Sequence, residues 1–141
     1  MGEKNMDYKK FEDNLARYLQ GKSCDLLQLQ RDTRYFKQCE YQGYVFRGMG
    51  FSQPIDKEEI RESDICSWST DMRVAENFAS HGRYQIIIIK KSTGISVQKL
   101  LDYLKANDLM VSESLQRCTT KYECEVLDSL YISDCSVLEP V

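Results

Sequence analysis

Hydrophobic positions in the first forty residues recur at helical spacing. Over residues 7–20 the apolar side chains lie three or four positions apart with charged residues between them, and Gly21 stands where a helix would end. A second, less regular helical stretch begins at Ser23 or Asp25, which are good capping residues, and runs to about Cys39. The pattern predicts two N-terminal helices, the first of them amphipathic.

After Gly43 the pattern changes to short runs that are typical of β-strands. One run contains four successive isoleucines, 86–89, which predicts a strand buried on both faces. The predicted strands cover residues 44–47, 65–69, 84–90, 122–127 and 131–138.

Two more helices and two loops are expected between these strands. A helix is predicted over residues 71–79, where apolar residues share one face, and Ser96 is a suitable cap for another that ends near Asn107. The polar segments 54–64 and 112–121 have no clear period, so we expect loops, the second of them exposed.

No repeat, low-complexity tract or linker divides the 141 residues, and 42% of them are hydrophobic. This length and composition suit one domain with a real core. We expect a single α+β domain over residues 1–141, with a helical part at 1–40 and a β-rich core at 41–141.

The charge and hydropathy of the chain exclude several function classes. The formal net charge is −3, so a nonspecific phosphate-backbone binder is not indicated, although a nucleic-acid substrate stays open. No apolar run approaches the roughly 20 residues that span a bilayer, and the first residues lack the apolar segment of a secretory signal. We therefore expect no membrane partner and a cytoplasmic location.

The cysteines and the single histidine limit the possible chemistry further. The six cysteines contain no Cys-x-x-Cys pair and His81 is the only histidine, so we expect no metal site and reduced, core-filling thiols. A Cys-His or Ser-His-Asp nucleophile is also disfavoured, because both plans need a histidine beside the nucleophile.

Three short segments carry candidate chemistry. Glu123 and Glu125 fall inside a predicted strand, where alternation places both carboxylates on one face, about 7 Å apart. A carboxylate pair can stabilise the oxocarbenium-like transition state of glycosidic cleavage and assist the attacking nucleophile. The alternative interpretation is the solvated face of an edge strand.

The second segment is Arg47 at the end of the first predicted strand. Its planar guanidinium suits a phosphate or a carboxylate, and the next residue, Gly48, permits close approach of a ligand to the backbone. The third segment, Ser67 to Asp71, is a hydroxyl-rich corner between a strand and a helix. A surface arginine and a capping segment with a core tryptophan are the corresponding alternatives.

Taken together and in this order, the three segments resemble the mono-ADP-ribosyltransferases of the Arg-Ser-Glu class, which includes bacterial toxins, phage enzymes and vertebrate ectoenzymes. The resemblance covers about residues 44–128. It includes the Val-Ala and Phe-Ala positions of the helix after Ser67, whereas Trp68 stands where the family usually has threonine. It implies two small packed, mainly antiparallel sheets around an NAD+ cleft, with N-terminal helices.

The resemblance also implies roles for five residues. Arg47 would hold the NAD+ phosphates, Gly48 would hold the nicotinamide carboxamide through its backbone, and Ser67 would position the catalytic glutamate. Glu125 would bind the ribose 2′-hydroxyl and stabilise charge at the anomeric carbon, while Glu123 would orient the acceptor. Glutamate at the position of Glu123 favours arginine as the acceptor.

Further residues are expected at the edges of this site. Arg83 is a candidate phosphate contact, with a solvated surface arginine as the alternative, and Ser69 belongs to the NAD+-binding corner. Trp68 and Phe78 are candidates for contact with NAD+, with a core position as the alternative for both. The family's target-recognition loop corresponds to residues 112–121, where Leu115, Gln116 and Arg117 are expected to be exposed.

The leading hypothesis is transfer of ADP-ribose from NAD+ to arginine on a protein, as a toxin, phage or regulatory enzyme would do. NAD+ hydrolysis uses the same site and stays open, as does a catalytically silent interaction module. Retention of Arg47, Ser67, Glu123 and Glu125 argues against the silent module.

Overall fold

A six-stranded sheet is the framework of the computed structural model, which describes residues 6–118 and 124–138. All neighbouring strands within this part of the chain run antiparallel, in the order β4-β5-β2-β1-β3-β6. The strands are β1 (Gly43–Phe51), β2 (Ser63–Ser69), β3 (Tyr84–Ser92), β4 (Ile95–Ser96), β5 (Glu125–Leu130) and β6 (Ser136–Leu138).

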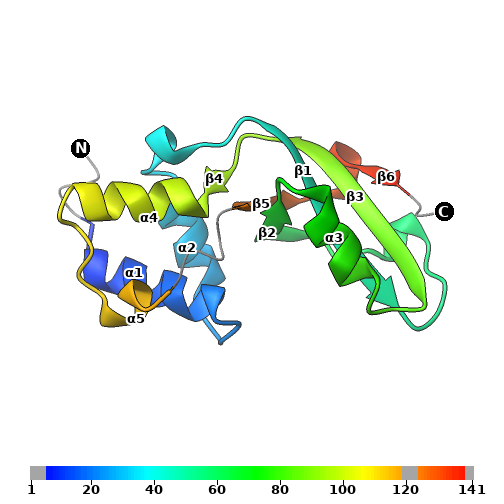
Figure 1. Cartoon of the computed structure of the whole chain (residues 1–141), viewed down its shortest axis with the longest axis horizontal. Coiled ribbons are helices and arrows are strands. Elements are labelled where there is room, and N and C mark those ends of the chain that lie inside the picture. The colour runs from blue at the N-terminus through cyan, green and yellow to red at the C-terminus, as the bar shows by residue number, and fades with distance from the viewer. Residues whose placement is uncertain (1–5, 119–123, 139–141) are drawn as a thin grey trace.

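The helices separate into two groups, as Figure 1 shows. One group gathers beside β4 at one end of the molecule, and α3 lies by itself along β1 and β3. The gathered helices are α1 (Tyr8–Leu19), α2 (Leu26–Thr33), α4 (Val97–Ala106) and α5 (Glu113–Gln116), and α3 covers Met72–Ala79. The expected α+β class is confirmed.

Local capping explains why the N-terminal helices begin where they do. The Asp7 carboxylate accepts the backbone N–H of Lys10 at 3.1 Å, and Asp25 accepts that of Gln28 at 3.0 Å. Both predicted N-terminal helices are confirmed, but the second ends at Thr33, and a short 3-10 turn covers 37–39. The predicted helices at 71–79 and after Ser96 also form.

The sheet consists of two halves that are barely joined. Strands β1 and β3 pair along their whole length, from Gly43 opposite Ser92 to Phe51 opposite Tyr84. By contrast, β1 and β2 share one pair, Phe46 opposite Ser69. This pair joins the half β4-β5-β2 to the half β1-β3-β6, so the strands form a single sheet and the expectation of two packed sheets is wrong.

The isoleucine strand packs on both of its faces. Ile87 packs with the alanines of α3, whereas Ile88, pointing the other way, packs in a cluster with Val45 and Trp68. Both isoleucines are at most 4% exposed. The prediction of a strand buried on both faces is confirmed at its centre.

The segment 112–121 is not the exposed loop that its polarity predicts. Ser112 caps the short helix α5 by accepting the backbone N–H of Leu115, and the Leu115 side chain is 1% exposed in the helical core. Residues 119–121 lie outside the described residues.

The described helices include none that is both long enough and apolar enough to cross a membrane. All six cysteines are free thiols, and Cys39, Cys66 and Cys135 are buried. Burial raises the pKa of the Cys66 thiol.

A buried carboxylate fastens α1 to the start of α5. Glu12 is fully buried, and its Oε1 accepts the backbone N–H groups of Val111 and Ser112 at 2.7 and 2.9 Å. Burial raises the Glu12 pKa, against the opposing effect of these two hydrogen bonds. The pKa of the neighbouring Asp13 is lowered instead, by its hydrogen bonds with the Ser112 hydroxyl and with Lys9.

These opposite shifts predict opposite pH responses for Glu12→Gln and Asp13→Asn. A raised folded-state pKa of Glu12 stabilises the protein below pH 4.5, and this effect is lost as the pH rises. The Glu12→Gln variant should therefore gain stability relative to wild type as the pH rises above 4.5. The Asp13→Asn variant should lose stability relative to wild type as the pH rises from below the lowered pKa of Asp13 to about 3.8, and the difference should stay constant above that. Urea unfolding at a series of pH values measures both, and a Glu12→Gln variant that loses relative stability as the pH rises would contradict the prediction.

Candidate functional site

A pocket of about 510 Å³ opens where β1 and β2 separate. Its walls come from both halves of the sheet and from two helices that are far apart in the sequence. The lining residues are Leu19 of α1; Phe46, Arg47 and Gly48 of β1; Ser67, Trp68 and Ser69 of β2; Val74, Ala75 and Phe78 of α3; and Cys124 and Glu125 at the start of β5.

Strand pairing brings Ser67 and Glu125 to the same face of the sheet. In the β2–β5 register Ser69 lies opposite Glu125 and Ser67 opposite Leu127, so the side chains of all four point to one side. The Ser67 hydroxyl donates to Oε2 of Glu125 at 3.0 Å. The serine and the glutamate, 58 positions apart in the chain, therefore form a direct pair.

Arg47 occupies the space that opens between the two strands. Its Nη1 donates to the backbone carbonyl of Ser67 at 2.7 Å, in the place that a backbone N–H of β1 would take if the two strands remained paired. The Nε atom of Arg47 is buried and has no hydrogen-bond partner among the described residues. Arg47, Ser67 and Glu125 thus line one pocket, and the guanidinium has further N–H groups besides the one that bonds the Ser67 carbonyl.

Tyr18 is a site residue that the sequence analysis missed. Its hydroxyl lies 2.8 Å from the Ser67 hydroxyl, and burial raises its pKa to about 12. The sequence showed Tyr18 only as an apolar position of an amphipathic helix. The phenol of Tyr18 could have indicated a hydrogen bond inside the protein, because a tyrosine on a buried face usually needs a hydrogen-bond partner.

Gly48 is explained by the packing of α3 on β1. A Cβ atom at this position would lie 1.7 Å from the carbonyl oxygen of Ala75. Glycine at this position therefore allows the backbone of α3 to pack closely on β1. Gly48 also borders the pocket. The same contact holds the exposed side chains Val74 and Phe78 over the pocket.

The other residues of the corner differ in what they present to the pocket. Phe78 is 61% exposed, whereas the Trp68 indole is 2% exposed and packs with Val126 in the core. Trp68 is a core side chain, the alternative that the sequence left open. The Ser69 hydroxyl bonds the backbone N–H and carbonyl of Asp71, the residue that caps α3.

Arg83 is not among the residues that line this pocket, and the expected phosphate contact stays a prediction. Tyr84, the residue after Arg83, pairs with Phe51 of β1. Phe51 is four residues from Arg47, a distance on the order of 13 Å along the strand. The Arg83 guanidinium instead lies over the Tyr84 ring, 5.8 Å from its centroid, and is exposed.

The expected target-recognition residues are only partly accessible. Gln116 and Arg117 are exposed on α5 and after it, but Leu115 is buried, so its assignment as an exposed contact is wrong. The apolar side chain is needed to seat the short helix against the helical core. Glu123 lies outside the described residues.

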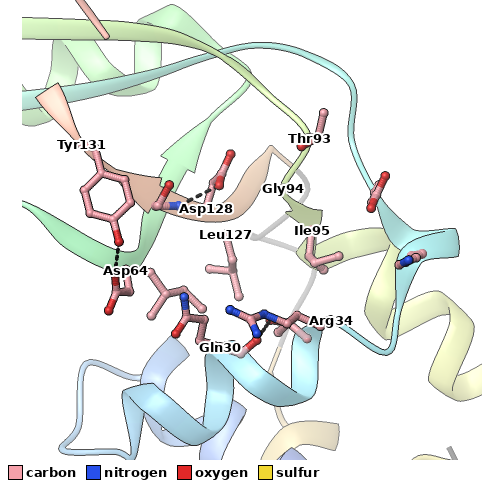
Figure 2. Close-up of a pocket in the computed structure, with 14 residues that line it drawn as sticks. Gln30, Arg34, Asp64, Thr93, Gly94, Ile95, Leu127, Asp128 and Tyr131 are labelled. Carbon is pink, nitrogen blue, oxygen red and sulfur yellow. Dashed lines mark hydrogen bonds between the residues drawn. The ribbon is translucent and has the colours of Figure 1, made fainter. Parts of the chain in front are cut away.

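A second pocket, of about 320 Å³, lies between α2 and the β2–β5 edge (Figure 2). Two of its three acids are already engaged within the protein: Asp64 accepts the Tyr131 hydroxyl, and Asp128 accepts the Ser129 N–H and the Ser92 hydroxyl. Lys90 also pairs with Asp128 at 3.1 Å. The arginine, serine and glutamate of the first pocket are absent from its lining.

The described residues contain no group of three or more His, Cys, Asp or Glu side chains that could hold a metal ion.

No protein-family model matches the sequence, and neither a curated protein nor a solved structure matches the chain. The function is therefore inferred from the geometry of the pocket.

The Gly48 contact predicts that Gly48→Ala destabilises the protein by about 1–3 kcal/mol, because the new methyl group forces α3 away from β1. Glu76→Ala, on the exposed face of the same helix, is the matched control and should have little effect. Urea unfolding measures both variants, and equal stability of the Gly48→Ala variant and wild type would refute the close contact.

Proposed function

We propose that the protein is a mono-ADP-ribosyltransferase, which cleaves the nicotinamide–ribose bond of NAD+ and transfers ADP-ribose to arginine on another protein. One observation carries the proposal: Arg47, Ser67 and Glu125, which are distant in sequence, line one pocket and are linked through Ser67. A guanidinium, a hydroxyl and a carboxylate around one pocket are the groups that the Arg-Ser-Glu class uses.

The pocket is suited to the nicotinamide half of NAD+. Its volume lies within the usual range for small-molecule sites, about 300–1,000 Å³. The Arg47 guanidinium supports a phosphate contact, since only one of its N–H groups bonds the Ser67 carbonyl and an anion accepts strong hydrogen bonds from the others. Leu19, Val74 and Phe78 contribute apolar side chains to the pocket lining, against which a nicotinamide ring can pack.

In the proposed reaction the bond between the ribose anomeric carbon and the nicotinamide nitrogen breaks, and its electron pair leaves with nicotinamide. The ring departs neutral, and positive charge develops on the ribose. The Glu125 carboxylate, held by the Ser67 hydroxyl, stabilises that charge and accepts a hydrogen bond from the ribose 2′-hydroxyl. This is electrostatic stabilisation that needs no covalent intermediate with the protein.

The acceptor step follows at the open side of the pocket. A nitrogen of the target arginine attacks the anomeric carbon and loses a proton, which Glu123 would accept on this proposal. The products are nicotinamide, the ADP-ribosylated protein and a proton. If water attacks instead, the same site yields free ADP-ribose.

The first test is Glu125→Gln, which keeps the size of the side chain and removes its charge. We expect loss of both ADP-ribosyl transfer and NAD+ hydrolysis by at least about 100-fold, because the transition-state charge is no longer stabilised. Incubation of the protein with labelled NAD+ and a cell lysate measures both, as a labelled protein band and as free ADP-ribose.

Glu58→Gln is the matched control, since Glu58 is an exposed glutamate outside the pocket. Activity equal to wild type in the Glu125→Gln variant would refute the proposed role of Glu125. Absence of both products with wild-type protein would favour the silent interaction module instead.

A second test separates the acceptor step from bond cleavage. Glu123→Ala should keep NAD+ hydrolysis within about threefold of wild type while transfer to protein falls by about 100-fold, since the acceptor loses its base. The ratio of protein-bound to free label measures the split. Equal loss of both activities would count against an acceptor-specific role for Glu123.

A further inference from the structure

The Tyr18, Ser67 and Glu125 side chains form a hydrogen-bond chain whose direction is determined. An ionised carboxylate only accepts, so the Ser67 hydroxyl donates its one hydrogen to Glu125, at 3.0 Å. The Tyr18 hydroxyl lies 2.8 Å from the same Ser67 oxygen. Because the serine hydrogen is already used, Tyr18 must donate to Ser67.

The start of this chain is held firmly by the helical core. Tyr18 is in the last turn of α1, and Phe11 and Leu15 of the same helix are at most 1% exposed. The fully buried Glu12 further fixes the helix through two backbone N–H groups. A phenol with this support can orient a serine hydroxyl more strictly than water can.

The phenol also keeps its proton over the working pH range, because burial raises its pKa to about 12. It remains a donor wherever Glu125 is ionised. The hydrogen bond that Tyr18 donates to the Ser67 oxygen polarises the Ser67 hydroxyl and strengthens its bond to the Glu125 carboxylate.

We infer that Tyr18 is a positioning residue, which acts through Ser67 to hold the Glu125 carboxylate in its orientation toward the pocket. The consequence for catalysis rests on the proposed function, whereas the coupling between the three side chains does not. The inference makes the N-terminal helix α1 part of the site, although it is remote from the sheet residues in sequence.

The coupling is tested by a double-mutant cycle on stability, with Tyr18→Phe, Ser67→Ala and the double variant. Phenylalanine keeps the ring and removes only the hydroxyl. We expect the shift in the urea midpoint of the double variant to be smaller than the sum of the two single shifts, since both substitutions remove the same bond. Additive shifts would overturn the inference.

The same variants test the catalytic consequence in NAD+ hydrolysis. Tyr18→Phe should lower kcat by about tenfold, the effect of removing a hydrogen bond from a network that ends on a charge, with KM for NAD+ within about twofold of wild type. In the Ser67→Ala background it should cause no further loss. Tyr35→Phe, an exposed tyrosine outside the pocket, is the control and should match wild type.

The outcomes separate the two proposals. A wild-type protein with no activity on NAD+ refutes the proposed function and leaves the stability cycle to decide the inference. With an active wild type, an unchanged kcat in Tyr18→Phe, or a full tenfold loss that persists in the Ser67→Ala background, shows that Tyr18 does not act through Ser67.

Discussion

The divergence of β1 from β2 after one residue pair is the constraint that creates the candidate site. Phe46 and Ser69 pair, and beyond them the strands separate. The Ser67 carbonyl then has no backbone partner in β1 and needs another donor, which Arg47 supplies. One local break in the sheet therefore opens the pocket and brings a guanidinium into it, beside the Ser67 and Glu125 side chains that the β2–β5 pairing puts together.

Helices from both ends of the molecule complete this opening. The backbone of α3 lies directly on Gly48, which brings the apolar side chains Val74 and Phe78 over the pocket. From the opposite side, α1 supplies the Tyr18 hydroxyl and the Leu19 side chain. The helical part and the sheet meet at the candidate site, so the stability of the helical core is linked to the orientation of the proposed catalytic groups.

Short-range patterns predicted most helices and strands, because periodicity and capping act within a few residues. They also identified Arg47, Ser67 and Glu125 as candidates, and the structure brings these three together. The burial of some side chains and the partners of others depend on contacts between distant parts of the chain, which the pattern does not contain. Leu115 is in a polar segment yet is buried by packing, and Tyr18 finds its partner 49 positions away. The phenol of Tyr18 signals the need for a hydrogen-bond partner, but no local pattern identifies the partner of either residue.

Equilibrium binding is the sharpest test of whether Arg47 belongs to an NAD+ pocket. Isothermal titration calorimetry of NAD+ into wild-type protein and the Arg47→Lys variant separates binding from catalysis. Lysine keeps the positive charge but loses the planar set of donors, which can bond the Ser67 carbonyl and a phosphate at the same time. We predict saturable one-site binding to the wild type and affinity at least about tenfold weaker in the variant. Equal affinity in both proteins, or no binding to the wild type, would contradict this assignment.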